Sequence, residues 1–215
     1  MKHLKNIVTI LCIAVGFFNT AGAAETSIGY FNTIKNDPEI EKGKTYYLRH
    51  NLMYDGFIWD ATNYLRGILL PINTKVTVVR FDHKGWWSGY DSGMYVYNPP
   101  YIRIKWDREM LQIEPGGFAR RSLEVIAKNM LSPKPVPIEL FGEEMARKII
   151  SGTLAKGMTR EQVIMTCGWP PGHRTPSLAS DRWIYWTGRV ANETLIFSGD
   201  KLMERKGRKA LPLAE

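Results

Sequence analysis

Short apolar or alternating runs recur between residues 45 and 106, and turn-forming residues separate them. In the last run Ile102, Ile104 and Trp106 fall on one face, while the residues between them are basic. This period of two is the pattern of a strand with one buried face. The predicted strands lie at 46–48, 67–70, 76–79 and 102–106. Several short strands at this spacing favour a small barrel or a sandwich.

A helical period follows the strand-rich region. Leu123, Ile126, Ala127 and Met130 repeat at the spacing of one helix face. Alternate prolines at 132–137 cannot continue a helix, and a second helix is predicted at 139–150. We therefore expect a helical, proline-rich connector at 115–138, between a β-domain at 45–114 and a second domain at 139–206.

The pattern of residues 158–204 predicts a capped helix, a loop and three strands. Thr159 and Gln162 match a T-x-x-Q capping box, in which each side chain satisfies an orphan backbone N–H. Gly168, followed by Pro170, ends the helix. Strands are predicted at 182–187 and 193–198, a tight turn at 198–200 and a third strand from residue 201. The tail at 207–215 is expected to fray.

The first 23 residues have the features of a secretory signal peptide. Lys2 and Lys5 precede an apolar run at 7–18, and small residues follow it at 20–24. The run is shorter than the roughly 20 residues that span a bilayer, and a retained N-terminal anchor is the alternative interpretation. Cleavage after Ala23 or Ala24 leaves a polar leader at 24–44, which we expect to be loosely held.

The expected mature chain is moderately basic. Removing residues 1–23 takes away two lysines and no acidic residue, so the formal net charge falls from +8 to +6. In an exported protein this charge either favours anionic lipid or polyanionic cell-wall material such as peptidoglycan, or belongs to an ordinary solvated surface. We expect no nucleic-acid partner in that compartment. Only Cys167 remains in the mature chain, so no internal disulfide is possible.

The residue types that carry most enzyme chemistry form no catalytic pattern. His50, His83 and His173 stand in three dissimilar contexts without metal-ligand spacing, and we interpret them as surface or turn residues. Cys167 falls in the last turn of a predicted helix and is interpreted as a buried, inert thiol rather than a nucleophile. We therefore predict no enzymatic activity, no metal and no cofactor.

Aromatic residues supply the candidate binding sites in the β-domain. Trp86, Trp87 and Tyr90 lie in a stretch rich in glycine and proline. Such rings provide a large contact area for a protein or a sugar. The alternative is that they fill the core of a small barrel.

The strand predicted at 182–187 is the second aromatic candidate. Trp183 and Tyr185 point to one face, and Trp186 points to the other together with Ile184. One face must cover the helices, and the other is a candidate interface. The predicted contact residues are Trp183, Tyr185 and Trp186, with Arg182 and Arg189 beside them.

The C-terminal third of the chain resembles the SmpA/OmlA (BamE-like) domain. The residues that carry this resemblance are Gly157-Met158-Thr159-x-Glu161-Gln162-Val163, Gly168-Trp169-Pro170, Trp183-Ile184-Tyr185 and Leu195-x-Phe197-x-Gly199-x-Lys201-Leu202. The resemblance covers about 140–205 and implies a helical pair packed on a three-stranded antiparallel sheet. Members of that family are small envelope proteins, several of them lipoproteins of the outer-membrane assembly machinery. The resemblance thus implies protein binding rather than catalysis.

This chain departs from the family pattern at its N-terminal side. It lacks a lipobox cysteine, and it carries an additional β-region. The pattern Gly67-x-Leu69-x-Pro71-Ile72-x-Thr74-x-Val76-x-Val78 in that region resembles the strand-turn-strand of bacterial SH3-like barrels.

These observations together predict an α+β protein, with a small SH3-like β-barrel domain followed by a BamE-like domain of two helices and a three-stranded antiparallel sheet. We expect a non-catalytic periplasmic protein that binds an envelope protein or assembly complex in outer-membrane biogenesis. Peripheral association with the outer membrane is compatible with that role. The alternative is a cell-wall or glycan-binding module that uses the aromatic loops of the β-domain.

Overall fold

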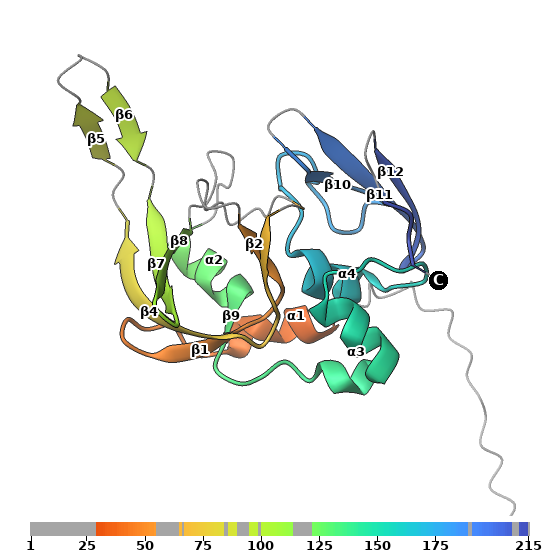
Figure 1. The fold of residues 1–215 in the computed structure, drawn as a ribbon, viewed down its shortest axis with the longest axis horizontal. Helices are drawn as coiled ribbons and strands as arrows, with labels where there is room; N and C mark the ends of the chain where they lie inside the picture. The colour runs from red at the N-terminus through yellow and green to blue at the C-terminus, as the bar shows by residue number, and fades with distance from the viewer. Residues whose placement is uncertain are drawn as a thin grey trace, which may run out of the picture.

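The computed structural model describes residues 29–54, 65, 67–83, 86–89, 95–98, 100–113, 122–188, 191–207 and 211–214. These residues form four α-helices, two short 3-10 helices and antiparallel sheets (Figure 1). The predicted α+β class is therefore confirmed. The predicted signal peptide at 1–23 lies outside the described residues.

The largest sheet has five strands in the order β8-β7-β4-β1-β9, and each neighbouring pair is antiparallel. Its described strands do not close into a barrel, so the prediction of a small closed SH3-like barrel is wrong in that respect. The edge strands β8 and β9 each pair with a single neighbour. The strands are β1 (Thr45–Leu48), β4 (Lys75–Asp82), β7 (Tyr101–Trp106), β8 (Glu109–Ile113) and β9 (Leu131–Ser132).

Helix α2 (Leu123–Met130) covers one face of this sheet. Its apolar stripe, which consists of the four residues predicted from the sequence, is buried against the apolar residues of the strands. Ser122 caps the helix by accepting a hydrogen bond from the backbone N–H of Val125. Strand β9 follows at once and pairs with β1. Residues 122–132 thus belong to the first core rather than to the predicted connector at 115–138. We call the five-stranded sheet with α2 the first module.

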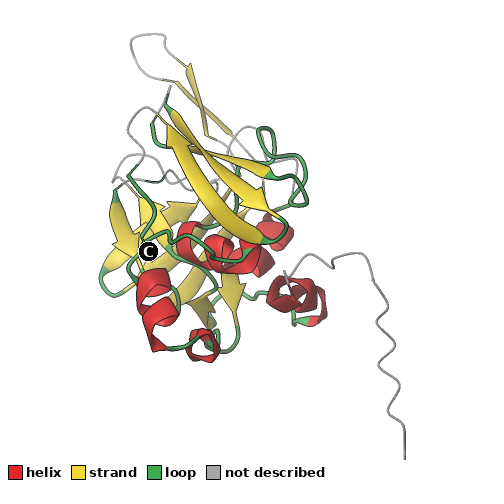
Figure 2. Cartoon of the chain, turned by 90° about the vertical axis from the view of Figure 1, so that its right-hand side faces the viewer, coloured by secondary structure: helices red, strands yellow, loops and turns green. Residues whose placement is uncertain are grey.

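The second module contains the helices and the sheet of the C-terminal part. A 3-10 turn, η2 (Ile138–Phe141), leads into α3 (Glu143–Ile150) and α4 (Arg160–Cys167), which contact each other. Strands β10 (Arg182–Trp186), β11 (Asn192–Ser198) and β12 (Lys201–Gly207) follow as an antiparallel meander. Figures 1 and 2 show α4 against one side of this sheet. The order of two helices and three strands matches the prediction.

The predicted capping box begins α4. The Thr159 hydroxyl accepts a hydrogen bond from the Gln162 N–H at 3.2 Å, and the Gln162 side chain accepts one from the Thr159 N–H at 2.8 Å. At the other end Gly168 adopts a φ of +78°, a conformation that a residue with a Cβ rarely adopts. Both predicted ends of this helix are confirmed.

Two short hairpins complete the described strands. One pairs β2 (Leu52–Tyr54) with β3 (Ile68–Leu70), and the other pairs β5 (Trp86–Gly89) with β6 (Tyr95–Asn98). In Figure 1 the β5–β6 hairpin projects beyond β4 and β7 as an arm.

The segment predicted as a loose leader at 24–44 is held firmly from residue 29 onward. It forms α1 (Gly29–Thr33) and η1 (Ile34–Asn36), and it buries Phe31 and Ile34 in the core of the second module. Phe31 packs edge-on against Trp169, with ring centroids 4.9 Å apart. The polar composition of the segment predicted no attachment, but Phe31 and Ile34 are buried, and Asp37 and Glu39 pair with Arg49 and Lys128.

The end of the chain is also attached. Strand β12 runs to Gly207, which is within the tail predicted at 207–215. Ala214 forms a parallel bridge with Ala155, and its backbone C=O accepts a hydrogen bond from the Lys156 N–H at 3.0 Å. The tail was predicted to fray, but its described residues are attached to the second module. None of the helices described here is long and apolar enough to cross a membrane.

Candidate binding surface

Strand β10 separates its aromatic residues between two faces. Trp183 and Tyr185 are 0% exposed, whereas Ile184 and Trp186 on the other face are partly exposed. The predicted alternation is therefore confirmed. The prediction that Trp183 and Tyr185 supply contact area is wrong, because both side chains are part of the core of the second module.

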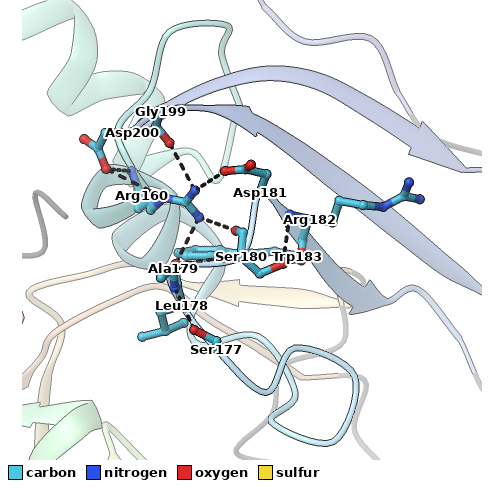
Figure 3. A network of polar contacts seen from close by, with 10 residues as sticks. All are labelled: Arg160, Ser177, Leu178, Ala179, Ser180, Asp181, Arg182, Trp183, Gly199 and Asp200. Atoms are coloured by element: carbon cyan, nitrogen blue, oxygen red, sulfur yellow. Dashed lines mark hydrogen bonds and ion pairs between the residues drawn. The ribbon is translucent and has the colours of Figure 1, made fainter. Parts of the chain in front are cut away.

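Arg160 explains how this part of the core is organised (Figure 3). It is the first residue of α4 and is 2% exposed. Its guanidinium carbon lies 4.4 Å from the ring centroid of Phe197 and 5.4 Å from that of Trp183. A cation over two aromatic faces is attracted by their quadrupoles. The side chain therefore places a cation in the core and packs against both rings.

The same guanidinium ties two loops to the helix, the one before β10 and the turn between β11 and β12. One terminal nitrogen donates hydrogen bonds to the backbone oxygens of Leu178 and Ser180, at 3.0 and 2.6 Å. The other donates to Asp181 Oδ1 at 3.1 Å and to the Gly199 oxygen at 3.0 Å. Burial lowers the pKa of Arg160, although Asp181 and Asp200 oppose that shift. An arginine whose donors are used in this way is structural, which its sequence position beside a helix cap did not indicate.

The other reactive groups of this core are also engaged internally. The Tyr185 hydroxyl donates a hydrogen bond to the Gly168 oxygen at 2.8 Å, and burial raises its pKa. Cys167 is buried, and desolvation raises the pKa of its thiol to about 12. A thiol with such a pKa is almost entirely un-ionised at neutral pH and is a poor nucleophile. The predicted burial of Cys167 is confirmed.

Trp186 is the aromatic residue that the outer face of β10 presents. The His173 ring stacks on its indole with centroids 6.1 Å apart and planes at 24°. The Arg174 guanidinium carbon lies 5.4 Å from the indole centroid. Both neighbours come from the loop before β10, which Thr175 fixes by accepting a hydrogen bond from the Ile184 N–H at 2.9 Å. This loop gives the indole a basic and polar surround.

The rest of this outer face mixes apolar and charged residues. Ile184 lies opposite Thr194, and the exposed Arg182 lies opposite Ile196. On β12 the Lys206 ammonium pairs with Glu204 at 2.6 Å. We call the set of Arg182, Ile184, Trp186, His173 and Arg174 the Trp186 face.

The remaining predicted site residues lie in another sheet or outside the described residues. Trp86 and Trp87 are in β5, where their backbones pair with Asn98 and Tyr97. The β5–β6 arm and β10 lie on opposite sides of the molecule in Figure 1, so the two aromatic candidates are not one site. Tyr90 and Arg189 lie outside the described residues.

His50 is the histidine whose burial the sequence did not indicate. It was expected at the surface or in a turn, but it is 2% exposed. Its Nδ1 lies 2.7 Å from the backbone oxygen of Asn51. Desolvation, together with the charge of Arg49, lowers its pKa to about 4. His50 is therefore a neutral residue of the interior at neutral pH.

His83 has a different environment. Its Nδ1 lies 3.4 Å from the Glu124 carboxylate, and both side chains are about half exposed. Across the described part of the chain, no three side chains of His, Cys, Asp or Glu are grouped so that they could hold a metal ion. Comparison of the chain with family models, curated proteins and solved structures finds no significant match.

Proposed function

We propose that this protein is a non-catalytic exported protein that binds an envelope protein or assembly complex through the Trp186 face. The observation that carries the proposal is the partly exposed indole of Trp186 on the outer face of β10, where it contacts His173 and Arg174. Tryptophan and arginine are the residue types most enriched at the energetic centres of protein interfaces. The apolar Ile184 beside them extends this contact area.

The SmpA/OmlA-like arrangement is part of the same proposal. Its support is the order of α3, α4 and three antiparallel strands at 138–207, together with the capping box that begins α4. For residues 45–114 the resemblance to an SH3-like domain extends to the antiparallel strands of an open sheet. The proposed periplasmic location rests on the signal-peptide features of residues 1–23.

The test is capture of a partner from envelope extracts with Trp186→Ala. Because Trp186 lies outside the core, the variant should keep the far-UV circular dichroism and melting temperature of the wild type. We expect captured partner to fall at least roughly tenfold, since truncation of a central interface tryptophan typically costs 2 kcal/mol or more. Trp106→Ala is the matched control, because Trp106 is a partly buried tryptophan at the end of a strand in the other sheet. Unchanged capture by folded Trp186→Ala refutes the Trp186 face as the interface.

A second candidate function uses the β5–β6 arm. Its projection beyond the first module in Figure 1 places Trp86 and Trp87 on an extended hairpin. Here the partner is cell-wall glycan, on which aromatic rings stack. Sedimentation with purified peptidoglycan at moderate salt separates the two candidates. Retention that Trp86→Ala and Trp87→Ala abolish, while Trp186→Ala does not, favours the glycan.

A further inference from the structure

The first module has one face that no described helix covers. Helix α2 lies on the side where Val76, Val78, Ile102 and Ile104 are buried. The alternate residues of β4 and β7 therefore point to the opposite face, apart from a bulge between Val78 and Arg80. Figure 1 shows α2 on the side of this sheet that faces the rest of the molecule.

That open face is strongly cationic. Lys75 and Lys105 are exposed, the Arg80 side chain is 58% exposed, and Arg103 is partly exposed. These four residues lie on two neighbouring strands, which are spaced about 4.8 Å apart. Among the described strand residues of this face, Asp82 is the sole acid, and it lies 2.9 Å from Arg80. The face therefore carries a net charge of about +3 (four cations and one acid).

The register makes this charge costly in the absence of a partner. Arg80 lies directly opposite Arg103 in the β4–β7 pairing. Like charges in directly opposed positions destabilise a sheet. Arg103 lies over the Tyr101 ring at 5.1 Å and donates a hydrogen bond to Gln112 at 3.1 Å, both of which are neutral groups. Asp82 offsets part of this repulsion through its pair with Arg80, and an external anion on this face would offset the rest.

The arrangement distinguishes between two kinds of anionic partner. An extended acidic peptide that uses sheet hydrogen bonding adds to an edge strand, whereas these cations occupy the face. A surface of many fixed anions matches cations that are distributed in two dimensions. The arm β5–β6 continues from β4 and β7, and its strands contain Trp86, Trp87, Tyr95 and Tyr97. Tryptophan and tyrosine are the residue types enriched at membrane–water interfaces.

We propose that the open face of the first module, centred on Lys75, Arg80, Arg103 and Lys105, docks on an anionic phospholipid bilayer. This site is separate from the Trp186 face and does not depend on a protein partner. The two surfaces belong to different sheets, so a protein bound to a membrane through one still presents the other.

The experiment is co-sedimentation of the mature chain with vesicles of equal parts phosphatidylserine and phosphatidylcholine, compared with pure phosphatidylcholine. Lys75→Gln with Lys105→Gln removes two exposed cations that make no described ion pair. Each Lys near an anionic surface contributes enough to lower affinity several-fold, so this double variant should bind the mixed vesicles roughly 30-fold more weakly. Ionic strength of about 1 M, at which the Debye length is about 3 Å, should also release the wild type.

The matched control is Lys134→Gln with Lys156→Gln, which removes the same charge from exposed positions outside the first module's sheet. It should bind as the wild type does. Equal loss in both double variants would show that only total charge matters and would overturn the proposal. Equal binding of the wild type to both kinds of vesicle would also overturn it. Soluble polyglutamate that binds as tightly as the mixed vesicles, with the same dependence on Lys75 and Lys105, would assign the face to an acidic polypeptide instead.

Discussion

The outer faces of the two sheets differ in how many cations they gather and in how those cations are paired. On the three-stranded sheet the cation of Lys206 has an acidic neighbour, Glu204, at 2.6 Å. Even the inner side pairs Arg205 with the buried Glu193 at 2.6 Å. On the five-stranded sheet Arg80 faces Arg103, and one acid serves the whole described face. The first face combines Trp186 with a few cations, one of which has an acidic partner, and it suits a protein interface. The second face gathers four cations around one acid and suits an anionic surface.

The difference shows that similar strand alternation produces different functional surfaces. In both sheets every second residue fills a core, as the sequence period predicts. What differs is the cross-strand neighbour, which depends on register and on the bulge in β4. Register is a tertiary property, since one residue of slip exchanges the two faces. A substitution in one module should therefore change the stability of that module and leave the surface of the other module unaffected.

The largest effect is expected for Arg160→Ala. The change leaves four hydrogen-bond acceptors without their donor and removes the cation from above Trp183 and Phe197. Hydrogen bonds to a charged group each contribute about 1.5–3 kcal/mol, so losing several together costs about 3–5 kcal/mol. We expect a loss of that size in the free energy of unfolding, measured by urea denaturation. Amide exchange should accelerate in β11 more than in β7.

The control for this change is Arg147→Ala. Arg147 pairs with Glu143 at 2.8 Å on the surface of α3, and both side chains are largely exposed. Such pairs contribute about 0.3–0.5 kcal/mol. Equal destabilisation by the two substitutions would contradict the structural role assigned to Arg160.

Local sequence signals predicted the elements better than they predicted the attachments between them. The stripe of α2, the capping box of α4 and the three C-terminal strands follow from short-range periodicity and cap chemistry. The buried polar residues at 49–51 did not, because a run of Arg, His and Asn between strands resembles an exposed turn. Their partners lie up to 115 positions away in the chain. A local sequence pattern spans only a few residues, so it cannot indicate partners this far apart in the chain.

The same reasoning explains the errors at the candidate site. Alternation correctly divided β10 into two faces but could not show which one covers α4, because that depends on how the meander folds over the helix. Trp183 and Trp186 are therefore the same residue type in one strand, but Trp183 is fully buried and Trp186 is partly exposed. The leader was misjudged for a related reason: Phe31 gains its burial from Trp169, which is remote in sequence.

Asn51 joins the two modules, and His50 beside it provides the second test. The Asn51 side chain donates to the Ile149 and Thr166 oxygens at 2.5 and 3.0 Å and accepts from the Ile72 N–H at 2.7 Å. Beside it, burial lowers the His50 pKa from 6.5 to about 4. Between these values the unfolded chain binds a proton that the folded chain does not. Stability from this group is therefore complete above about pH 6.5 and falls as the pH decreases towards 4.

The expected loss is about 3 kcal/mol across that window, at about 1.4 kcal/mol for each pKa unit. Urea denaturation of wild type and His50→Gln between those pH values measures it. The variant should lose most of this pH dependence, whatever its absolute stability. His83→Gln is the control, because His83 lies at the surface beside Glu124. A variant His50→Gln that retains the full wild-type slope would show that other groups cause the pH dependence.

The smallest expected effect is local to α4. Thr159→Ala removes the hydroxyl that accepts the Gln162 N–H, and it weakens the reciprocal bond of the capping box. Loss of an N-cap typically costs about 1 kcal/mol. Thr153→Ala is the matched control, because Thr153 is exposed and its hydroxyl contacts only Ser151 among the contacts described. Urea denaturation should resolve the difference between the two variants.

Vesicle binding through the first module should be equal in both, since neither residue belongs to its open face. Weakened vesicle binding in Thr159→Ala would mean that the two modules are energetically coupled, and that their outer faces do not act independently.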